Sequence, residues 1–248
     1  AQEILGLPVD YVRLSLRDHS PAYLGTAPQW QAAEAALREA AAAAGLTGRG
    51  LSLVDAAGEA AFYGPKLDLQ VRDGRGQEET IATVQVDFSQ PERFGLVYDA
   101  PDGSRQPVTM IHRGTVGAME RVTAALLEHY QGRLPLWLAP VQVRVLPVSP
   151  GQDEAARRVT DGLLAAGLRA RLDVDGSLGA RIRHSRQRRD YLIAVLGEAE
   201  AAAGTVRVTD VAAGLECAVS EAQLVRLAGD AYAARRPGVD WPPEITGG

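Results

Sequence analysis

The pattern of apolar and polar positions in the first half of the chain predicts strands separated by helices. Residues Tyr11–Leu16 alternate, as expected of a half-buried strand. Thr26 and Gln29 form a capping box that opens a helix at about 27–44. The apolar face of that helix comprises Trp30, Ala33, Leu37, Ala40 and Ala44. Further strands at 50–55, 67–72, 80–88 and 95–99, joined by turns, predict an antiparallel meander, and a helix at 116–131 follows.

The second half of the chain has a different pattern, and a stiff Pro-rich connector at 134–140 precedes it. Strands are expected at 141–147, 169–173, 191–196 and 205–209, with helices at 152–166 and 179–187. A second capping box, Ser220 with Gln223, opens a last helix. The inward residues of that helix are Leu224, Leu227, Ala228 and Ala231. The fold class is therefore mixed α/β (α+β), with domains at 1–136 and 137–235 and a flexible tail at 236–248.

Composition and charge narrow the class of protein. Apolar residues make up 46% of the chain, enough for a packed core. A net charge of −5 argues against a general nucleic-acid coat protein and leaves room for a local basic patch. Cys217 is the single cysteine, so an internal disulfide is excluded and a cytoplasmic location is expected. We see no signal peptide and no run of 18 apolar residues, so no membrane partner is expected.

Three segments of the first half carry candidate chemistry. A Gly-Pro turn would place Tyr63 and Lys66 at the lip of a strand, where they suit a polar, partly anionic ligand. Gln85 lies on the polar face of the strand at 83–88. Gly117 and Arg121, four residues apart, would share a helix face and leave room for a flat ligand beside guanidinium. Each segment also fits a solvated hairpin, strand or helix face.

His112 and a basic run complete the candidates. His112 by itself fits a hydrogen-bonded core histidine better than a zinc site, because zinc needs at least three protein ligands. The basic run could meet a phosphate backbone or could equally be a solvated helix face. It comprises Arg181, Arg183, His184, Arg186, Arg188 and Arg189.

Taken in order, these segments resemble the threonyl-tRNA synthetase family over almost the whole chain. Gly58–Lys66 differs from the family's Gly-Glu-Gly-Ala-Phe-Tyr-Gly-Pro-Lys only at Ala60. Ile111–Arg113 followed by Gly117–Arg121 is similar to class II motif 3. Leu134–Val143 matches Phe-Pro-Leu-Trp-Leu-Ala-Pro-Val-Gln-Val except at its first residue. The resemblance implies the rear of a class II antiparallel catalytic sheet, followed by a small α/β anticodon-binding domain.

The resemblance also implies roles for individual residues. Arg121 would be the catalytic motif 3 arginine that stacks on adenine and contacts the phosphates of ATP, beside Gly117 and Ala118. Tyr63, Lys66 and Gln85 would line the threonine and adenylate pocket. His112 would be one of three ligands of a zinc ion that binds threonine, and magnesium would accompany ATP. The expected tRNA contacts are Arg181, Arg183, Arg186 and Glu200.

Other parts of the family pattern are missing or altered. Motifs 1 and 2, the other two zinc ligands and the editing domain would lie before Ala1. The family is homodimeric through motif 1, so that interface is expected to be largely absent. Asp175 and Ser177 stand where the family has anticodon-reading asparagine and lysine, and Thr209 replaces an arginine. Two interpretations remain: part of a threonine–tRNA ligase, inactive by itself, or a non-catalytic paralogue that binds tRNA or regulates a synthetase.

Overall fold

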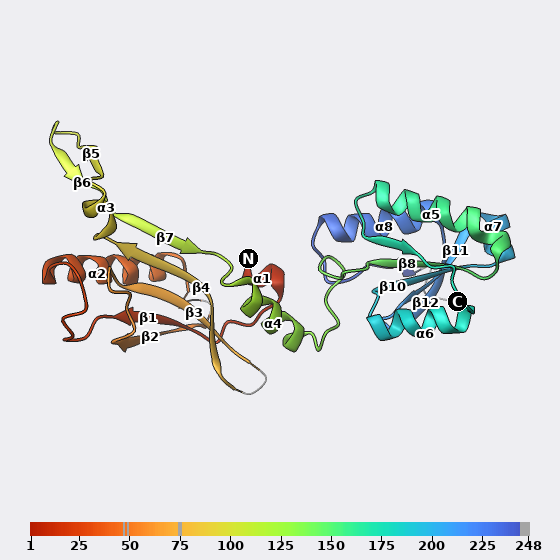
Figure 1. The fold of residues 1–248 in the computed structure, drawn as a ribbon, viewed down its shortest axis with the longest axis horizontal. Helices are drawn as coiled ribbons and strands as arrows, with labels where there is room; N and C mark the ends of the chain where they lie inside the picture. Colours follow the sequence, from red (N-terminus) through yellow and green to blue (C-terminus); the bar gives the residue numbers. More distant parts are fainter. Residues whose placement is uncertain (47, 49, 74–75, 244–248) are drawn as a thin grey trace. The chain divides into compact units, whose positions relative to one another are not determined.

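The computed structural model divides into two units, Ala1–His129 and Tyr130–Gly248, and each is described by itself (Figure 1). The structure describes residues 1–46, 48, 50–73 and 76–243. Within these ranges, no helix is both long and apolar enough to cross a lipid bilayer.

The first unit is built on a five-stranded sheet in the order β2-β1-β3-β4-β7. Its strands are β1 (Tyr11–Leu16), β2 (Ser52–Ala57), β3 (Lys66–Arg72), β4 (Glu78–Asp87) and β7 (Met110–Gly114). Its helices are α1 (Gln2–Leu5), α2 (Ala27–Ala43), α3 (Gln90–Arg93) and α4 (Met119–His129). Strands β1, β3, β4 and β7 pair antiparallel, as expected. The predicted meander is wrong at β2, which pairs with β1 in parallel because α2 carries the chain back between them.

Helix α2 covers the apolar face of this sheet. Its first turn is capped as predicted, with Oε1 of Gln29 accepting from the backbone N–H of Thr26 at 2.7 Å. Its buried residues are Trp30, Ala33, Leu37 and Ala41. The expected contributions of Ala40 and Ala44 are wrong, because both are exposed and Ala41 takes the inward position. Ala33, Leu37 and Ala41 pack in one cluster with apolar side chains of the strands, and α2 leaves the opposite, polar face of the sheet uncovered. The strand residues of this cluster are Val12, Leu14, Leu67 and Val86.

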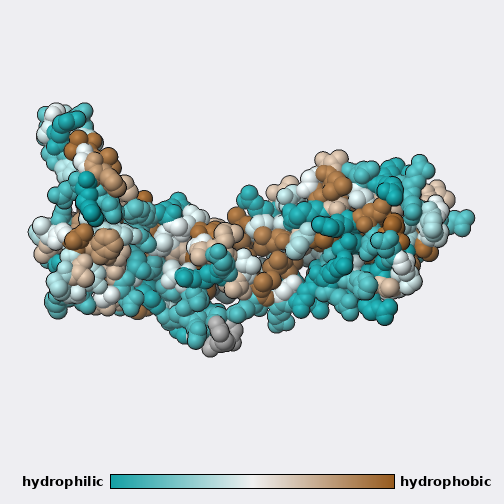
Figure 2. All heavy atoms as spheres, in the orientation of Figure 1, coloured by the Kyte–Doolittle hydropathy of each residue, from teal (hydrophilic) through white to brown (hydrophobic). Residues whose placement is uncertain are grey.

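A small hairpin stands apart from the five-stranded sheet. Strands β5 (Val97–Asp99) and β6 (Arg105–Pro107) pair only with each other. Its neighbourhood exposes large side chains, including Phe94 (71% exposed), Val97 and Tyr98. Brown spheres mark exposed hydrophobic residues on this hairpin in Figure 2. The segment expected as a strand of the meander therefore belongs to a separate ribbon.

The second unit has a sheet in the order β12-β11-β10-β8-β9. Its strands are β8 (Val143–Pro147), β9 (Ala170–Leu172), β10 (Leu192–Leu196), β11 (Thr205–Asp210) and β12 (Leu215–Ser220). Its helices are η2 (Pro150–Gln152), α5 (Asp153–Ala165), α6 (Leu178–Arg188), α7 (Glu198–Ala203) and α8 (Glu221–Ala233). Strands β9, β8 and β10 are parallel, whereas β10, β11 and β12 are antiparallel. Helices α5 and α8 lie on one side of the sheet and α6 on the other (Figure 1).

The segment after Arg235, for which the sequence predicts a flexible tail, contacts the second unit. The carbonyl of Pro237 accepts from the N–H of Leu136 at 2.8 Å. The indole of Trp241 donates to Asp210 at 2.9 Å, and Val239 packs against the core beside it. Residues 237–241 therefore pack against the second unit. Residues 244–248 of the expected tail lie outside the described part of the chain.

Candidate functional site

The polar face of the first sheet gathers most of the residues predicted from the sequence. The register places Lys66 of β3, Gln85 of β4 and His112 of β7 directly opposite one another in one row. The neighbouring row pairs Asp68 with Thr83. Because directly opposed residues project from the same face of a sheet, these side chains form one polar surface.

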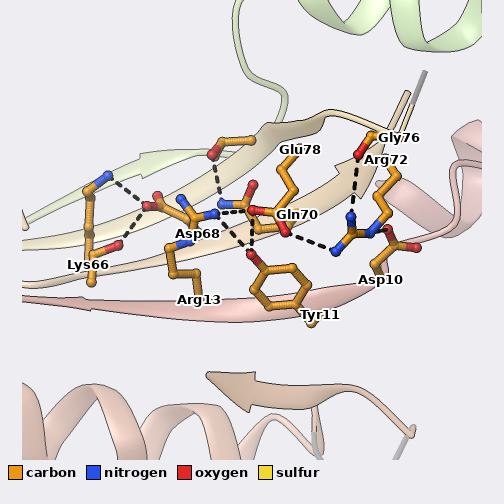
Figure 3. Close-up of polar contacts among 11 residues, drawn as sticks. Asp10, Tyr11, Arg13, Lys66, Asp68, Gln70, Arg72, Gly76 and Glu78 are labelled. Atoms are coloured by element: carbon orange, nitrogen blue, oxygen red, sulfur yellow. Dashed lines mark hydrogen bonds and ion pairs between the residues drawn. The ribbon is translucent and has the colours of Figure 1, made fainter. Parts of the chain in front are cut away.

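Asp68 is the centre of this surface (Figure 3). Its carboxylate is only 2% exposed and accepts hydrogen bonds from three side chains. The donors are the hydroxyl of Ser15 at 3.0 Å, the hydroxyl of Thr83 at 2.7 Å and the ammonium of Lys66 at 2.7 Å. Of these residues the sequence predicted only Lys66 as a site residue. A strand pattern does not indicate which carboxylate will accept hydrogen bonds from several neighbouring side chains.

The second part of the surface is formed by Tyr63 and Gln85. The Tyr63 hydroxyl donates to Oε1 of Gln85, and Nε2 of Gln85 donates to the hydroxyl of Thr83 at 3.3 Å. Burial, followed by the nearby charges of Asp87 and Asp68, raises the pKa of Tyr63. The phenol is protonated at neutral pH and donates its single O–H to Gln85.

The turn that places Tyr63 depends on Gly64. A Cβ atom at Gly64 would lie 1.8 Å from the carbonyl oxygen of Val86, so no other residue fits there without movement of the backbone. The Gly-Pro pair thus lets the loop approach strand β4 closely and presents Tyr63 above Gln85. This agrees with the expectation that the turn fixes the lip of a strand.

His112 is held by a buried carboxylate. Its Nε2 lies 2.8 Å from Oδ2 of Asp87, a residue with no solvent exposure. The other oxygen of Asp87 accepts from the backbone N–H groups of Ser89 and Gln90, both at 2.9 Å. The His112 ring is 41% exposed and lies 5.5 Å from the ring of Tyr63. The prediction of a core histidine is therefore right about the hydrogen bond and wrong about the core, because the exposed ring faces the polar surface.

The fit of these residues to a metal ion is partial. A histidine whose Nε2 is fixed by a carboxylate can present Nδ1 to a metal, which is the usual arrangement of a metal-binding imidazole. Over the described ranges, however, no three His, Cys, Asp or Glu side chains are grouped so that they could hold a metal. His112 as a metal ligand therefore stays a prediction.

Arg121 lies at the other end of β4. Its Nε is 3.0 Å from Oε2 of Glu79, and Nη1 donates to the carbonyl of Thr80 at 3.3 Å. Thr80 and Gln85 are separated along the strand by roughly 17 Å, at about 3.4 Å per residue. Arg121 therefore contacts β4 near its beginning, whereas Tyr63 contacts it near its end.

Gly117 does not share a helix face with Arg121. That expectation is wrong because α4 begins at Met119, later than the predicted position 116. The N–H of Gly117 instead donates to the carbonyl of Ile81 at 2.7 Å, and a Cβ there would approach that oxygen to 3.2 Å. Gly117 and Ala118 form the turn that brings Arg121 alongside the start of β4.

A charged cluster that the sequence did not predict continues the polar surface towards the β3–β4 turn (Figure 3). Glu78 accepts from Arg13 at 2.5 Å and from Arg72 at 3.0 Å. Arg13 also donates to the hydroxyl of Tyr11 at 2.9 Å. This hydrogen bond is the largest cause of the raised pKa of the Arg13 guanidinium.

In the second unit the basic run is divided between the interior and the surface. The expectation that Arg181 is a surface cation does not hold, because its side chain is 4% exposed and donates to the carbonyl of Asp173 at 2.8 Å. Arg183 and Arg186, on the same helix α6, are exposed. Glu200 accepts from the N–H of Gly197 at 3.1 Å and lies 3.5 Å from Arg207.

Family models match both units. The model described as "tRNA synthetase class II core domain (G, H, P, S and T)" matches residues 2–130, and "Anticodon binding domain" matches residues 142–228. The chain is 45% identical over 206 residues to a threonine–tRNA ligase of Thermus thermophilus, covering 82% of this chain and 30% of that protein. It is 40% identical over 227 residues to that of Synechococcus elongatus, covering 91% and 37%. The chain thus spans about a third of the length of these relatives.

Solved structures agree with these matches. The RNA binding domain of threonyl-tRNA synthetase from Cryptosporidium parvum superposes with a TM-score of 0.81 at 31% identity, covering 92% of this chain and 56% of that one. A putative threonyl-tRNA synthetase from Aeropyrum pernix gives a TM-score of 0.74 at 30% identity, covering 100% and 58%.

Proposed function

This chain belongs to the class II tRNA synthetase core family, and from that membership we propose that it works in the ATP-dependent ligation of threonine to tRNA. The observation that carries the proposal is the row of Lys66, Gln85 and His112, with Tyr63 above it, on one face of the sheet. Donors and acceptors are held there in a fixed array, which suits a small polar substrate.

The amino-acid end of the site is proposed at this row. Tyr63, Lys66 and Gln85 would contact threonine and the adenylate, and the positive charge of Lys66 would attract the threonine carboxylate or the α-phosphate. His112 would bind zinc through Nδ1, because Asp87 already holds Nε2. Zinc, when bound, would hold the amino and hydroxyl groups of threonine and so disfavour valine, which lacks the hydroxyl.

The nucleotide end is proposed at Arg121, with Gly117 and Ala118 in the adjoining turn. The guanidinium would stack on adenine and pair with the phosphates of magnesium-bound ATP. Glu79 orients it from 3.0 Å away. Arg121 and Gln85 lie far apart along β4, so an elongated ligand could contact one of them at each of its ends. The threonine carboxylate would attack the α-phosphorus of ATP there, forming the mixed anhydride and releasing pyrophosphate.

The second unit is proposed to bind tRNA. Arg183 and Arg186 are exposed on α6, so they can meet phosphates. Glu200 lies at the start of α7 with its carboxylate engaged by Gly197 and Arg207. Ser177 caps α6 through a 3.3 Å bond from Ala180, so its hydroxyl serves the helix. A cytoplasmic location fits this proposed function.

The proposal is tested by threonine-dependent exchange of pyrophosphate into ATP, with the natural protein that contains these residues. Threonine should support exchange, whereas valine should not. Arg121→Gln should abolish exchange while leaving tRNA binding unchanged, and Arg157→Gln, an exposed arginine on α5, serves as the matched control. Exchange that does not depend on threonine, or that survives loss of Arg121, would refute the assignment.

A second candidate, a non-catalytic tRNA-binding paralogue, is favoured by the altered anticodon positions Asp175, Ser177 and Thr209. It predicts tRNA binding without any pyrophosphate exchange. The two functions are therefore separated by the same pair of measurements. We also propose that the 248 residues by themselves do not aminoacylate, because they supply one candidate zinc ligand and no motif 2. Threonylation of tRNA by the 248 residues alone would disprove that.

A further inference from the structure

Gln70 is a buried amide on the polar face of β3 to which the proposed function gives no role. It lies between Asp68 and Arg72 along the strand (Figure 3) and is only 1% exposed. Its Nε2 donates to the hydroxyl of Thr80 on β4 at 2.8 Å. Because the side chain is almost fully covered, any effect of Gln70 on a ligand must pass through Thr80.

Thr80 lies at a β-bulge. Leu69 pairs with Ala82 in the ladder between β3 and β4. The next pair is Gln70 with Thr80, which leaves Ile81 as an extra residue on β4. Ile81 has no solvent exposure, so the bulge is packed into the interior of the unit. A bulge turns the backbone groups around it away from the directions that they have in a regular strand.

The bulge presents two successive carbonyl groups to the segment that carries Arg121. The carbonyl of Thr80 accepts from Nη1 of Arg121 at 3.3 Å, and the carbonyl of Ile81 accepts from the N–H of Gly117 at 2.7 Å. In a regular strand successive carbonyl groups point to opposite sides, whereas here both bond the same segment. Gly117 and Arg121 are therefore tied to one short stretch of backbone.

The contacts of Arg121 with β4 determine how its guanidinium is presented. A hydrogen bond from Nη1 lies near the plane of the group, so the Thr80 carbonyl does not cover the flat faces of the guanidinium. Glu79, the residue before Thr80, adds an ion pair to Nε at 3.0 Å. Contacts at two of its nitrogens hold the guanidinium in one orientation, and both come from residues at the bulge.

We propose that Gln70 is a positioning residue for the nucleotide end of the site: its bond to Thr80 fixes the bulge and thereby the guanidinium of Arg121. The proposal rests on the proposed function, because it assumes that Arg121 contacts ATP. Lys66 is held by Asp68 and Gln85 by Tyr63, so the threonine end has supports of its own. Loss of the bond between Gln70 and Thr80 should therefore weaken the binding of ATP and leave that of threonine unchanged.

The test is pyrophosphate exchange by the natural protein that contains these residues, with the KM for ATP and the KM for threonine measured separately. Thr80→Val keeps the shape of the side chain and removes the hydroxyl that accepts from Gln70. It should raise the KM for ATP about five- to ten-fold, because Arg121 is no longer held in place. The KM for threonine should stay within about two-fold of wild type. Thr80→Ser keeps the hydroxyl and should keep the wild-type KM for ATP.

Gln70→Leu removes the other partner of the same bond and should raise the KM for ATP as Thr80→Val does. Because each change breaks one shared bond, the double variant should be no worse than either single variant. The matched control is Ser104→Ala, which removes the hydroxyl that accepts from the amide of Gln106 at 2.9 Å. This pair lies at the β5–β6 hairpin, so both KM values should stay at wild type.

A KM does not depend on how much of the protein is folded, so the outcomes separate positioning from stability. A wild-type KM for ATP in Thr80→Val and Gln70→Leu would overturn the inference and leave the proposed function intact. A parallel rise of both KM values, or an equal rise in Thr80→Ser, would also overturn it, because the bond would then serve the sheet as a whole. Absence of threonine-dependent exchange in the wild-type protein would overturn the proposed function and this role of Gln70 with it.

Discussion

The ammonium of Lys66 donates to the carboxylate of Asp68 across 2.7 Å, two residues along the same face of β3. Asp68 is almost fully buried and also accepts from Ser15 and Thr83. A cation held in this way has little freedom to move, so Asp68 fixes where the positive charge of Lys66 is presented.

Replacement of Asp68 by Asn should therefore harm both stability and activity. Asparagine keeps the shape but removes the charge and leaves Lys66 without its partner, at a cost of about 1–3 kcal/mol in the free energy of unfolding. Threonine-dependent pyrophosphate exchange should fall more than the folded fraction does. Urea denaturation and exchange rates check this. The matched control is Asp55→Asn, whose ion pair with Arg38 is about half exposed and should contribute less than about 1 kcal/mol.

The Gly-Pro turn yields a second prediction. Gly64→Ala should destabilise the first unit by at least about 2 kcal/mol, because the new Cβ would collide with the carbonyl of Val86 and neither backbone can move freely. Gly229→Ala provides the contrast, since it lies in helix α8 with no atom within 4 Å of the new Cβ. It should stabilise by about 0.5–1 kcal/mol. Equal effects at the two glycines, measured by denaturation, would contradict the close approach.

The elements of the fold could be predicted where the side-chain pattern is periodic. The buried face of α8, at Leu224, Leu227, Ala228 and Ala231, is confirmed because a single helix face carries it. Helix α7 was not predicted, because its six residues contain no buried side chain and hence no periodic signal. Strand β12 was not predicted either, although Leu215–Ser220 alternates. Its last residue, Ser220, also belongs to the capping box of α8, which is the stronger sequence signal.

The site was predicted in part for similar reasons. Lys66, Gln85 and His112 are on one face because strand alternation fixes that face. Their mutual register, and the role of Asp68, depend on which strands pair, and the sequence does not specify this locally. The burial of Arg181 was likewise hidden, because a charged residue normally indicates a solvated helix face, whereas here the carbonyl of Asp173 accepts from its guanidinium.

A third prediction concerns the buried pair formed by Arg144 and Asp190. Asp190 accepts from Nε of Arg144 at 2.8 Å and from Nη2 at 3.4 Å, and both side chains are nearly inaccessible. Asp190→Asn leaves the cation buried without its charge partner and should cost about 3–5 kcal/mol. Arg144→Met with Asp190→Leu removes both charges and should recover much of that loss. If the double variant is as unstable as Asp190→Asn in denaturant titrations, the loss of stability does not come from the unpaired buried cation.

The last prediction is a loss of stability in alkali through Tyr191. Burial, and secondarily the charge of Asp210, raises the pKa of Tyr191 from 10.0 to about 12 in the folded protein. Below pH 10 the phenol is protonated in both states, so it contributes no pH dependence. Between pH 10 and 12 the unfolded chain releases this proton first, which favours unfolding by up to about 1.4 kcal/mol per pH unit. Tyr191→Phe should flatten the fall in unfolding free energy over that window. The measurement is the unfolding free energy of wild type and Tyr191→Phe at pH 8, 10 and 11. An identical decline in the two proteins would show that the phenol ionises equally in the folded and unfolded states.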